Sequence, residues 1–233
     1  MKKATAKLEL PPTSREEGGE QAVSPRLSSG YFTTGSTKDE VLAIQGTPDR
    51  FTERSLHYGT SDVFFRDGRV LSWYNGYPKL KVRMPPTSST DKTYFAVGST
   101  KDEVLAIQGT PDRFTDSSFH YGTSDVFFQN GRVVSWYNGY PKLRARMLPA
   151  TSTDKRFFTV GSTKDEVLAI QGTPDRFTER ALHYGTSDVF FKDGRVSSWY
   201  NGYPKLRVRM LPSSGTPGKG SPTPDEELRL PDS

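Results

Sequence analysis

The chain has 233 residues, a formal net charge of +5 and no cysteine. Without cysteine, neither a disulfide framework nor a thiolate metal site can form. Its apolar runs fall short of the roughly 18 residues that a membrane span requires, and its basic residues are interspersed with acidic ones instead of clustering as they do in dedicated nucleic-acid binders.

A long internal repeat dominates the sequence. The segment Gly-Ser-Thr-Lys-Asp-Glu-Val-Leu-Ala-Ile-Gln-Gly-Thr-Pro-Asp begins at Gly35 and restarts at Gly98 and Gly161, which is a period of 63 residues. A fixed period of this length is typical of an array of one small unit. We therefore predict a disordered N-terminal segment at 1–30, three modules at 31–85, 94–148 and 157–211, and a disordered tail at 212–233.

The predicted linkers between the modules are rich in Pro, Ser and Thr. They run from Pro85 to Lys92 and from Leu148 to Lys155, and each can stretch to roughly 30 Å. Because that reach is comparable with the diameter of a small module, two arrangements stay open: beads on a string, or modules that pack on one another.

Each copy begins with signals for a short helix. In the first copy Thr37 and Glu40 form a capping box, and Val41 starts a short apolar face. Gly46 suits the position just after a helix, and Pro48 blocks its continuation. We expect a helix of about two turns between these signals.

Strand signals follow the helix. In the first copy we expect strands at 56–58, 62–65, 69–74 and 80–84, with 31–33 as a short edge strand. The hairpin turn before the third of these has the chemistry of type I′, as Asp67-Gly68, Asn130-Gly131 or Asp193-Gly194 in the three copies. The predicted fold class is α+β, with three tandem small modules, each a short helix packed on a three- to four-stranded antiparallel β-meander.

The helix segment quoted above is followed by Tyr58-Gly59, by Val63-x-Phe65-x-x-Gly68-x-Val70 and by a closing strand. This pattern resembles the SmpA/OmlA (BamE-like) repeat family, and β-lactamase inhibitor proteins are similar in fold and also occur as tandem copies. The resemblance implies one or two helices on a three-stranded antiparallel sheet. It also implies a non-enzymatic module that binds other proteins, often in a bacterial cell envelope.

Strand alternation divides the sheet side chains between two faces. One set is apolar and is predicted to meet the helix: Leu56, Tyr58, Val63, Phe65, Val70, Leu80 and Val82. The opposite set is aromatic and basic, and these are the usual anchor residues of protein interfaces. The candidate binding residues are His57, Phe64, Trp73, Lys81 and Arg83; His120, Phe127, Trp136, Arg144 and Arg146; and His183, Phe190, Trp199, Arg207 and Arg209.

The tryptophan of each copy allows two interpretations. On strict alternation Trp73 belongs to the outward face, where it would contact a ligand. Alternatively, it completes the core across a bulge or packs one module against the next. The same choice applies to Trp136 and Trp199.

The residues of the repeat give little support for a catalytic site or a metal site. Each copy carries one histidine, without an accompanying nucleophile or second base. A metal site built from His57, His120 and His183 would need three modules to meet on one axis. We therefore predict no enzymatic activity, no metal and no cofactor.

The sequence favours a non-catalytic scaffold that binds unidentified proteins through three repeated aromatic-basic faces, because linked weak sites gain avidity. One alternative is nucleic-acid binding, with the aromatic side chains as a stacking platform. Another is a purely structural repeat whose faces pack between modules. The first residues show no apolar signal region and no lipobox cysteine, so the default expectation is cytoplasmic, or the cell envelope if the natural N-terminus is longer.

Overall fold

The computed structural model describes residues 30–210, so the predicted disordered segments lie outside it apart from Gly30. Each repeat contains one helix and four strands in the same order. In the first repeat they are α1 Lys38–Gln45, β1 Arg50–Phe51, β2 Ser55–Tyr58, β3 Ser61–Arg66 and β4 Arg69–Tyr74. The second has α2 Lys101–Gln108, β5 Arg113–Phe114, β6 Ser118–Tyr121, β7 Ser124–Gln129 and β8 Arg132–Tyr137. The third has α3 Lys164–Gln171, β9 Arg176–Phe177, β10 Ala181–Tyr184, β11 Ser187–Lys192 and β12 Arg195–Tyr200.

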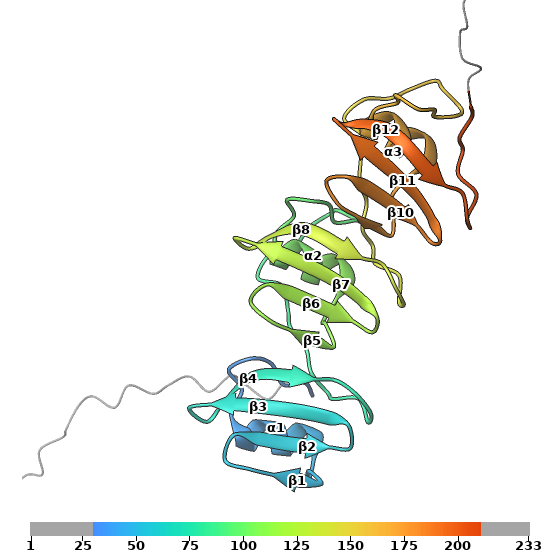
Figure 1. Ribbon diagram of the computed structural model, residues 1–233. Coiled ribbons are helices and arrows are strands. Elements are labelled where there is room, and N and C mark those ends of the chain that lie inside the picture. Colours follow the sequence, from blue (N-terminus) through green and yellow to red (C-terminus); the bar gives the residue numbers. More distant parts are fainter. Residues whose placement is uncertain (1–29, 211–233) are drawn as a thin grey trace, which may run out of the picture.

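The strands form one sheet and not three. All 12 are antiparallel neighbours in chain order, from β1 to β12 (Figure 1). The prediction of three modules, each with its own small sheet, is therefore wrong. The two-residue strands β5 and β9 join the repeats, since Tyr74 pairs with Arg113 and Tyr137 with Arg176. Two residues are too few to show a strand period, so this continuity could not be predicted from local patterns.

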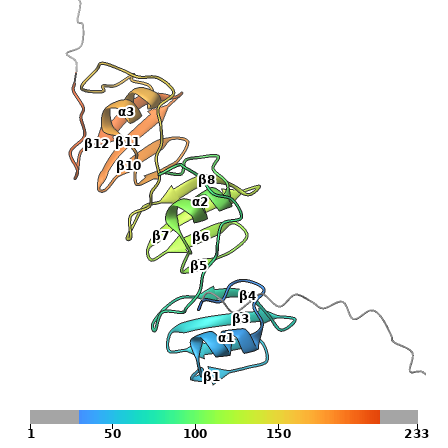
Figure 2. The same ribbon diagram turned by 180° about the vertical axis from the view of Figure 1, so that it is seen from behind.

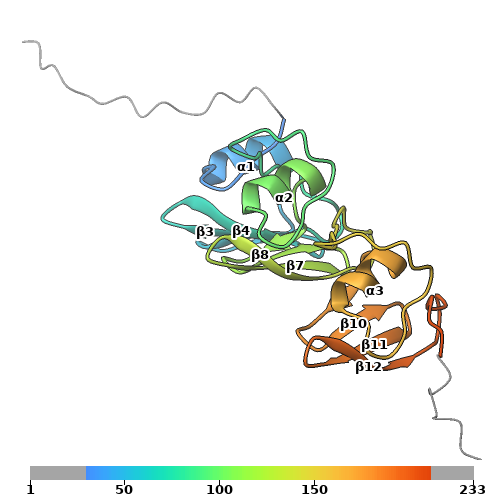
Figure 3. The same cartoon turned by 90° about the horizontal axis from the view of Figure 1, so that it is seen from above.

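The three helices lie on the same face of the sheet (Figures 2 and 3). The predicted capping box is confirmed: the Glu40 amide donates to Thr37 Oγ1 at 3.2 Å, and the Thr37 amide donates to Glu40 Oε2 at 2.8 Å. After the helix, the Gly46 amide donates to the Leu42 carbonyl at 2.9 Å, with a φ of 94° that favours glycine. Within residues 30–210, the opposite face of the sheet carries no helix.

The β3–β4 hairpin contains both the predicted turn and an irregularity that the sequence did not reveal. Asp67 and Gly68 have φ values of 51° and 71°, as a type I′ turn requires. The register then shifts between Phe64 and Phe65. One residue of β4 is thereby left over, so that Val70 and Trp73 point to the same face of the sheet.

The bulge corrects the outward assignment of the tryptophans. Trp73 and Trp136 are each only 1% exposed and belong to the core, together with the helix residues. Trp199, at the open end of the sheet, is half-buried and packs against the third cluster. The interpretation that places this side chain in the core across a bulge is the one the structure bears out.

After β4 the chain leaves the sheet. The predicted strands at 80–84 and 31–33 are wrong, since only Phe32 and Val82 form an isolated parallel bridge. This segment lies beside the helix, because the Lys81 amide donates to the side chain of Gln45 at 2.7 Å. Where the chain leaves the sheet, Gly76 packs closely against Thr60: a Cβ atom at this position would come within 2.4 Å of the Thr60 carbonyl oxygen.

The core is continuous from one repeat to the next. Phe114 and Met84 pack against the clusters of both the first and second repeats, and Phe177 and Met147 do so for the second and third.

The segment before α2 is fixed by an ion pair of 2.6 Å between Lys92 and Glu103. The hydrogen bond from Lys92, with help from the Thr100 amide, lowers the pKa of Glu103.

Candidate functional site: the helix-free face of the sheet

Cross-strand pairing brings four residue types into one line on the helix-free face. Arg50 pairs with His57, His57 with Asp62, and Asp62 with Tyr74. These positions alternate along their strands with buried core residues, so their side chains point away from the helices. Because Tyr74 pairs in turn with Arg113, the line crosses into the second repeat.

We call this line the cross-strand row. It crosses all twelve strands and consists of Arg50, His57, Asp62, Tyr74, Arg113, His120, Asp125, Tyr137, Arg176, His183, Asp188 and Tyr200. Residues directly opposite each other on neighbouring antiparallel strands have Cβ atoms about 5 Å apart. The row is therefore a continuous band of polar and aromatic side chains, in which the order Arg, His, Asp, Tyr occurs three times.

The histidine and the aspartate of each repeat are joined by a short hydrogen bond. His57 Nδ1 lies 2.6 Å from Asp62 Oδ1, and the equivalent distances in the other two repeats are 2.5 Å. Because an ionised carboxylate only accepts hydrogen bonds, Nδ1 is the donor. In the neutral imidazole, Nε2 then accepts from the Ser55 hydroxyl, 2.8 Å away.

The order Ser–His–Asp resembles that of a nucleophilic triad, but its setting does not suit catalysis. Ser55 is only 7% exposed, and its hydroxyl also lies 2.7 Å from the Thr52 hydroxyl. The strand that carries it lies inside the sheet, paired with β1 on one side and β3 on the other. In the third repeat Ala181 replaces the serine. The arrangement orients the histidine, and the absence of enzymatic activity stays a prediction.

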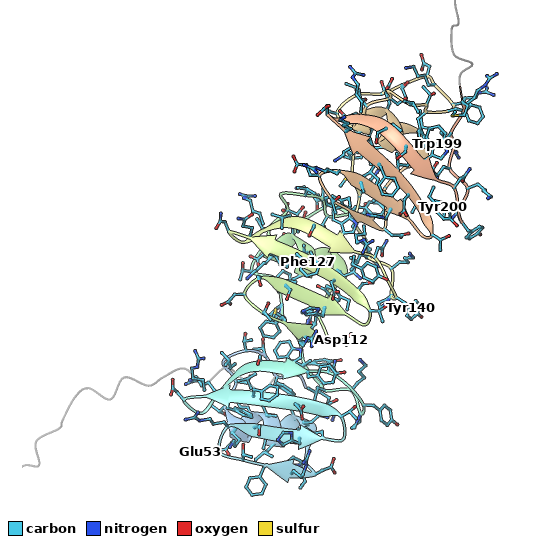
Figure 4. All side chains as sticks on the ribbon, viewed as in Figure 1. Glu53, Asp112, Phe127, Tyr140, Trp199 and Tyr200 are labelled. Carbon is cyan, nitrogen blue, oxygen red and sulfur yellow. The ribbon has the colours of Figure 1, made fainter. Side chains whose placement is uncertain are left out.

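Exposed aromatic side chains flank the row. Phe64, Phe127 and Phe190 are 39%, 38% and 39% exposed, and Phe127 is seen on this face in Figure 4. Within the row, Tyr74 and Tyr137 are each 44% exposed. The face therefore offers each potential ligand an arginine, a locked His–Asp pair and two aromatic rings per repeat.

The structure divides the predicted binding residues into three groups. On the helix-free face lie His57, Phe64, His120, Phe127, His183 and Phe190. In the core lie Trp73 and Trp136, with Trp199 half-buried at the end. In the segments after β4, β8 and β12, beside the helices, lie Lys81, Arg83, Arg144, Arg146, Arg207 and Arg209.

The last group corrects the expectation that these cations share a face with the aromatics. Lys81 Nζ donates to the Ile44 carbonyl at 3.1 Å, and Arg144 and Arg207 donate to the matching helix carbonyls at 3.4 and 3.2 Å. A cation at a helix C-terminus satisfies a free carbonyl and offsets the helix dipole. Lys81, Arg144 and Arg207 therefore stabilise the helix ends.

Of the twelve residues of the cross-strand row, the sequence-based prediction of binding residues contained only the three histidines. Arg50 was missed because its strand has two residues, and Tyr74 because the bulge reverses the alternation beyond it. Ser55 was missed as the partner of His57. Its spacing of two residues along one strand was a usable signal, since such residues share a face.

Within residues 30–210, no group of three or more His, Asp or Glu side chains is placed to hold a metal ion. No helix in that range is long and apolar enough to cross a membrane. No family model matches the chain, and no curated protein or solved structure matches it either.

Proposed function

We propose that the chain is a non-catalytic scaffold that binds other proteins through the helix-free face of its sheet. The observation that carries the proposal is the cross-strand row, which presents the same exposed Arg, Tyr and neighbouring Phe three times. Exposed aromatic rings and arginines are the side chains that most often anchor protein interfaces. The resemblance to SmpA/OmlA repeats also favours protein binding.

The spacing of the three sites follows from the sheet. Equivalent residues are four strands apart, and neighbouring strands lie about 4.8 Å apart, so the sites repeat about every 19 Å. Because one sheet holds them, their separation does not depend on flexible linkers. A partner with a matching repeat gains avidity, which raises affinity by about 10²–10⁴-fold when all sites engage.

The charges of the face favour protein over nucleic acid. Each arginine of the row is accompanied by an aspartate, so that Arg50 and Asp62 cancel within one repeat. Phosphates approaching the row would meet these carboxylates. Lys81, which follows β4, reaches to a helix end and not to this face. A nucleic-acid platform needs a groove of net positive charge beside its aromatic side chains.

The test compares two triple variants of the full chain. In the face variant, Phe64, Phe127 and Phe190 are changed to Ser. In the control, Tyr77, Tyr140 and Tyr203 are changed to Ser; they are 80%, 81% and 79% exposed, and Tyr140 lies beyond the strand ends (Figure 4). Proteins that immobilised parent chain captures from a bacterial extract are identified and then titrated against each variant.

We expect the control to bind as the parent does and the face variant to lose at least about 100-fold in affinity. Single-site variants should lose much less than the triple variant. If the face variant bound its partners as tightly as the parent does, that result would contradict the proposal. An oligonucleotide titration at several salt concentrations adds a second criterion, since salt-dependent binding to this face would favour the nucleic-acid alternative.

A further inference from the structure

The two junctions between repeats are built from the same contacts. At the first, Trp73 Nε1 donates to the Pro111 carbonyl at 3.1 Å, and the indole meets the Phe114 ring edge to face with centroids 4.7 Å apart. At the second, Trp136 contacts the equivalent proline and phenylalanine at 3.2 and 4.7 Å. The junction is therefore a reproducible interface with an aromatic centre.

A polar rim surrounds each aromatic centre. At the first junction Lys79 Nζ lies 2.9 Å from Asp112 Oδ1, and the Asn75 amide donates to the Asp112 carbonyl at 2.8 Å. The Met84 amide donates to the Thr110 hydroxyl at 2.9 Å. The second junction repeats all three contacts, with distances of 2.9, 2.8 and 3.1 Å. Asp112 marks this rim between the first two repeats in Figure 4.

Within the described part of the chain, the two ends of the array carry the two halves of this junction without a partner repeat. The first repeat has the receiving residues Thr47, Pro48, Asp49, Arg50 and Phe51, and the third has the donating residues Trp199, Tyr200, Asn201, Lys205 and Met210. Every one of these ten has the residue type found at the internal junctions. The half-interfaces therefore match each other in shape and chemistry.

Exposure confirms that the receiving half is open. Phe51 is 75% exposed, whereas Phe114 and Phe177 are half-buried. Leu42 is half-buried, whereas Leu105 is 6% exposed. A groove of about 610 Å³ lies here and is lined by Leu42, Pro48, Phe51 and Leu56 among others. At the internal junctions the preceding repeat covers the equivalent surface.

The donating half is open in the same way. Met210 is 71% exposed, whereas Met84 and Met147 are half-buried. Trp199 and Tyr200 lie on the last strand of the sheet, at the far end from β1 (Figures 1 and 4). Lys205 already contacts the Asn201 carbonyl at 3.2 Å, as Lys142 contacts Asn138 at the second junction. Its ammonium group is thus placed as at an internal junction.

We propose that a second copy of this chain docks head to tail on the first, so that β12 of one copy pairs with β1 of the next. The new junction joins Trp199 to Pro48 and Phe51, and Lys205 to Asp49. Within the described residues, Asp49 uses one carboxylate oxygen for the Gly59 amide and has no lysine partner, whereas Asp112 has both. The two interface halves differ, so the assembly grows as a chain and does not stop at a two-fold dimer.

Inside one molecule the linkers hold the repeats at an effective concentration in the mM range. Separate copies lack this help. We therefore expect association to rise with protein concentration between about 1 µM and about 1 mM. A constant monomer mass over that range, measured by sedimentation velocity, would overturn the proposal.

Two surface variants of the full chain test the geometry. Phe51→Glu blocks the receiving half, and Lys205→Glu blocks the donating half by placing a carboxylate against Asp49. Both side chains are exposed, so the fold is expected to persist, which far-UV circular dichroism checks. Each variant alone is expected to associate at least about tenfold more weakly than the parent.

Mixing the two variants gives the decisive measurement. The free donating half of Phe51→Glu fits the free receiving half of Lys205→Glu, and growth then stops. We expect a one-to-one dimer in the mixture and monomers in each separate sample. The controls Tyr77→Glu and Lys192→Glu make the same chemical changes away from both ends and should associate as the parent does. No dimer in the mixture, or full-sized oligomers from either blocked variant, would contradict head-to-tail docking.

Discussion

The replacement of Trp73 by Ala tests the internal junction, with Trp199→Ala as a control of identical chemistry. Trp73 is 1% exposed, and its ring contacts Phe114 from the next repeat. Truncating a buried tryptophan to alanine costs about 3–5 kcal/mol. Loss of the edge-to-face ring contact and of the indole hydrogen bond places the expected cost near the upper end of that range.

The control lacks both of the cross-repeat contacts. Trp199 is half-buried against the third core cluster, where its ring lies 6.3 Å from that of Phe158 between centroids. We expect Trp199→Ala to cost about 2 kcal/mol, since less of the side chain leaves an apolar environment. Trp136→Ala repeats the first measurement at the second junction and should match Trp73→Ala.

The assay is urea unfolding of the full chain followed by far-UV circular dichroism, at a concentration of about 1 µM that keeps the copies apart. The free energy of unfolding is obtained by linear extrapolation. If the three tryptophans served as outward ligand contacts, all three variants would cost similar amounts, below about 1 kcal/mol each. That result would refute the placement of Trp73 in the core.

Three further predictions concern local contacts. Gly76→Ala places a Cβ atom 2.4 Å from the Thr60 carbonyl oxygen, and should cost about 1–3 kcal/mol in thermal unfolding, an effect of steric overlap alone. Thr100→Ala removes the helix cap and should cost about 1 kcal/mol, while Thr100→Ser should restore it; equal melting temperatures for both would contradict the cap. The pKa of Glu103 in the folded chain lies below its ordinary value of 4.5 because of the hydrogen bond from Lys92. Its stabilising effect is therefore present above pH 4.5 and is lost as the pH falls through the folded pKa. The difference in stability between Lys92→Met and the parent should be largest near pH 7 and should shrink as the pH is lowered below 4.5.

Local signals predicted the elements whose cause lies within a few residues. The capping box at Thr37 and the type I′ turn at Asp67 each depend on neighbours in the chain, and both are confirmed. The strand 69–74 was predicted with its observed bounds. Alternation also placed Leu56 and Val63 in the core, because a strand with period two exposes one face.

The candidate site could be predicted only in part. Alternation placed His57 and Phe64 correctly on the helix-free face, where strands β2 and β3 are regular. It failed at Trp73, because an extra residue in β4 reverses which side chains point inward. It also failed at Lys81, since that residue follows the exit of the chain from the sheet. The cross-strand row needs the pairing of every strand with its neighbour, which no single segment encodes.

The sequence by itself determined the repeat, the helix ends, the hairpin turns and the apolar face, because each arises from local chemistry copied three times. Only the tertiary structure decided that the copies share one sheet. That continuity depends on two-residue strands such as Arg113–Phe114, which have no preference strong enough to form alone. In the second repeat this strand lies against the indole of Trp73 and the edge of β4, whereas its equivalent β1 pairs with β2 alone. The matching residues at the two ends of the array, Phe51 and Trp199, have no neighbouring repeat among the described residues.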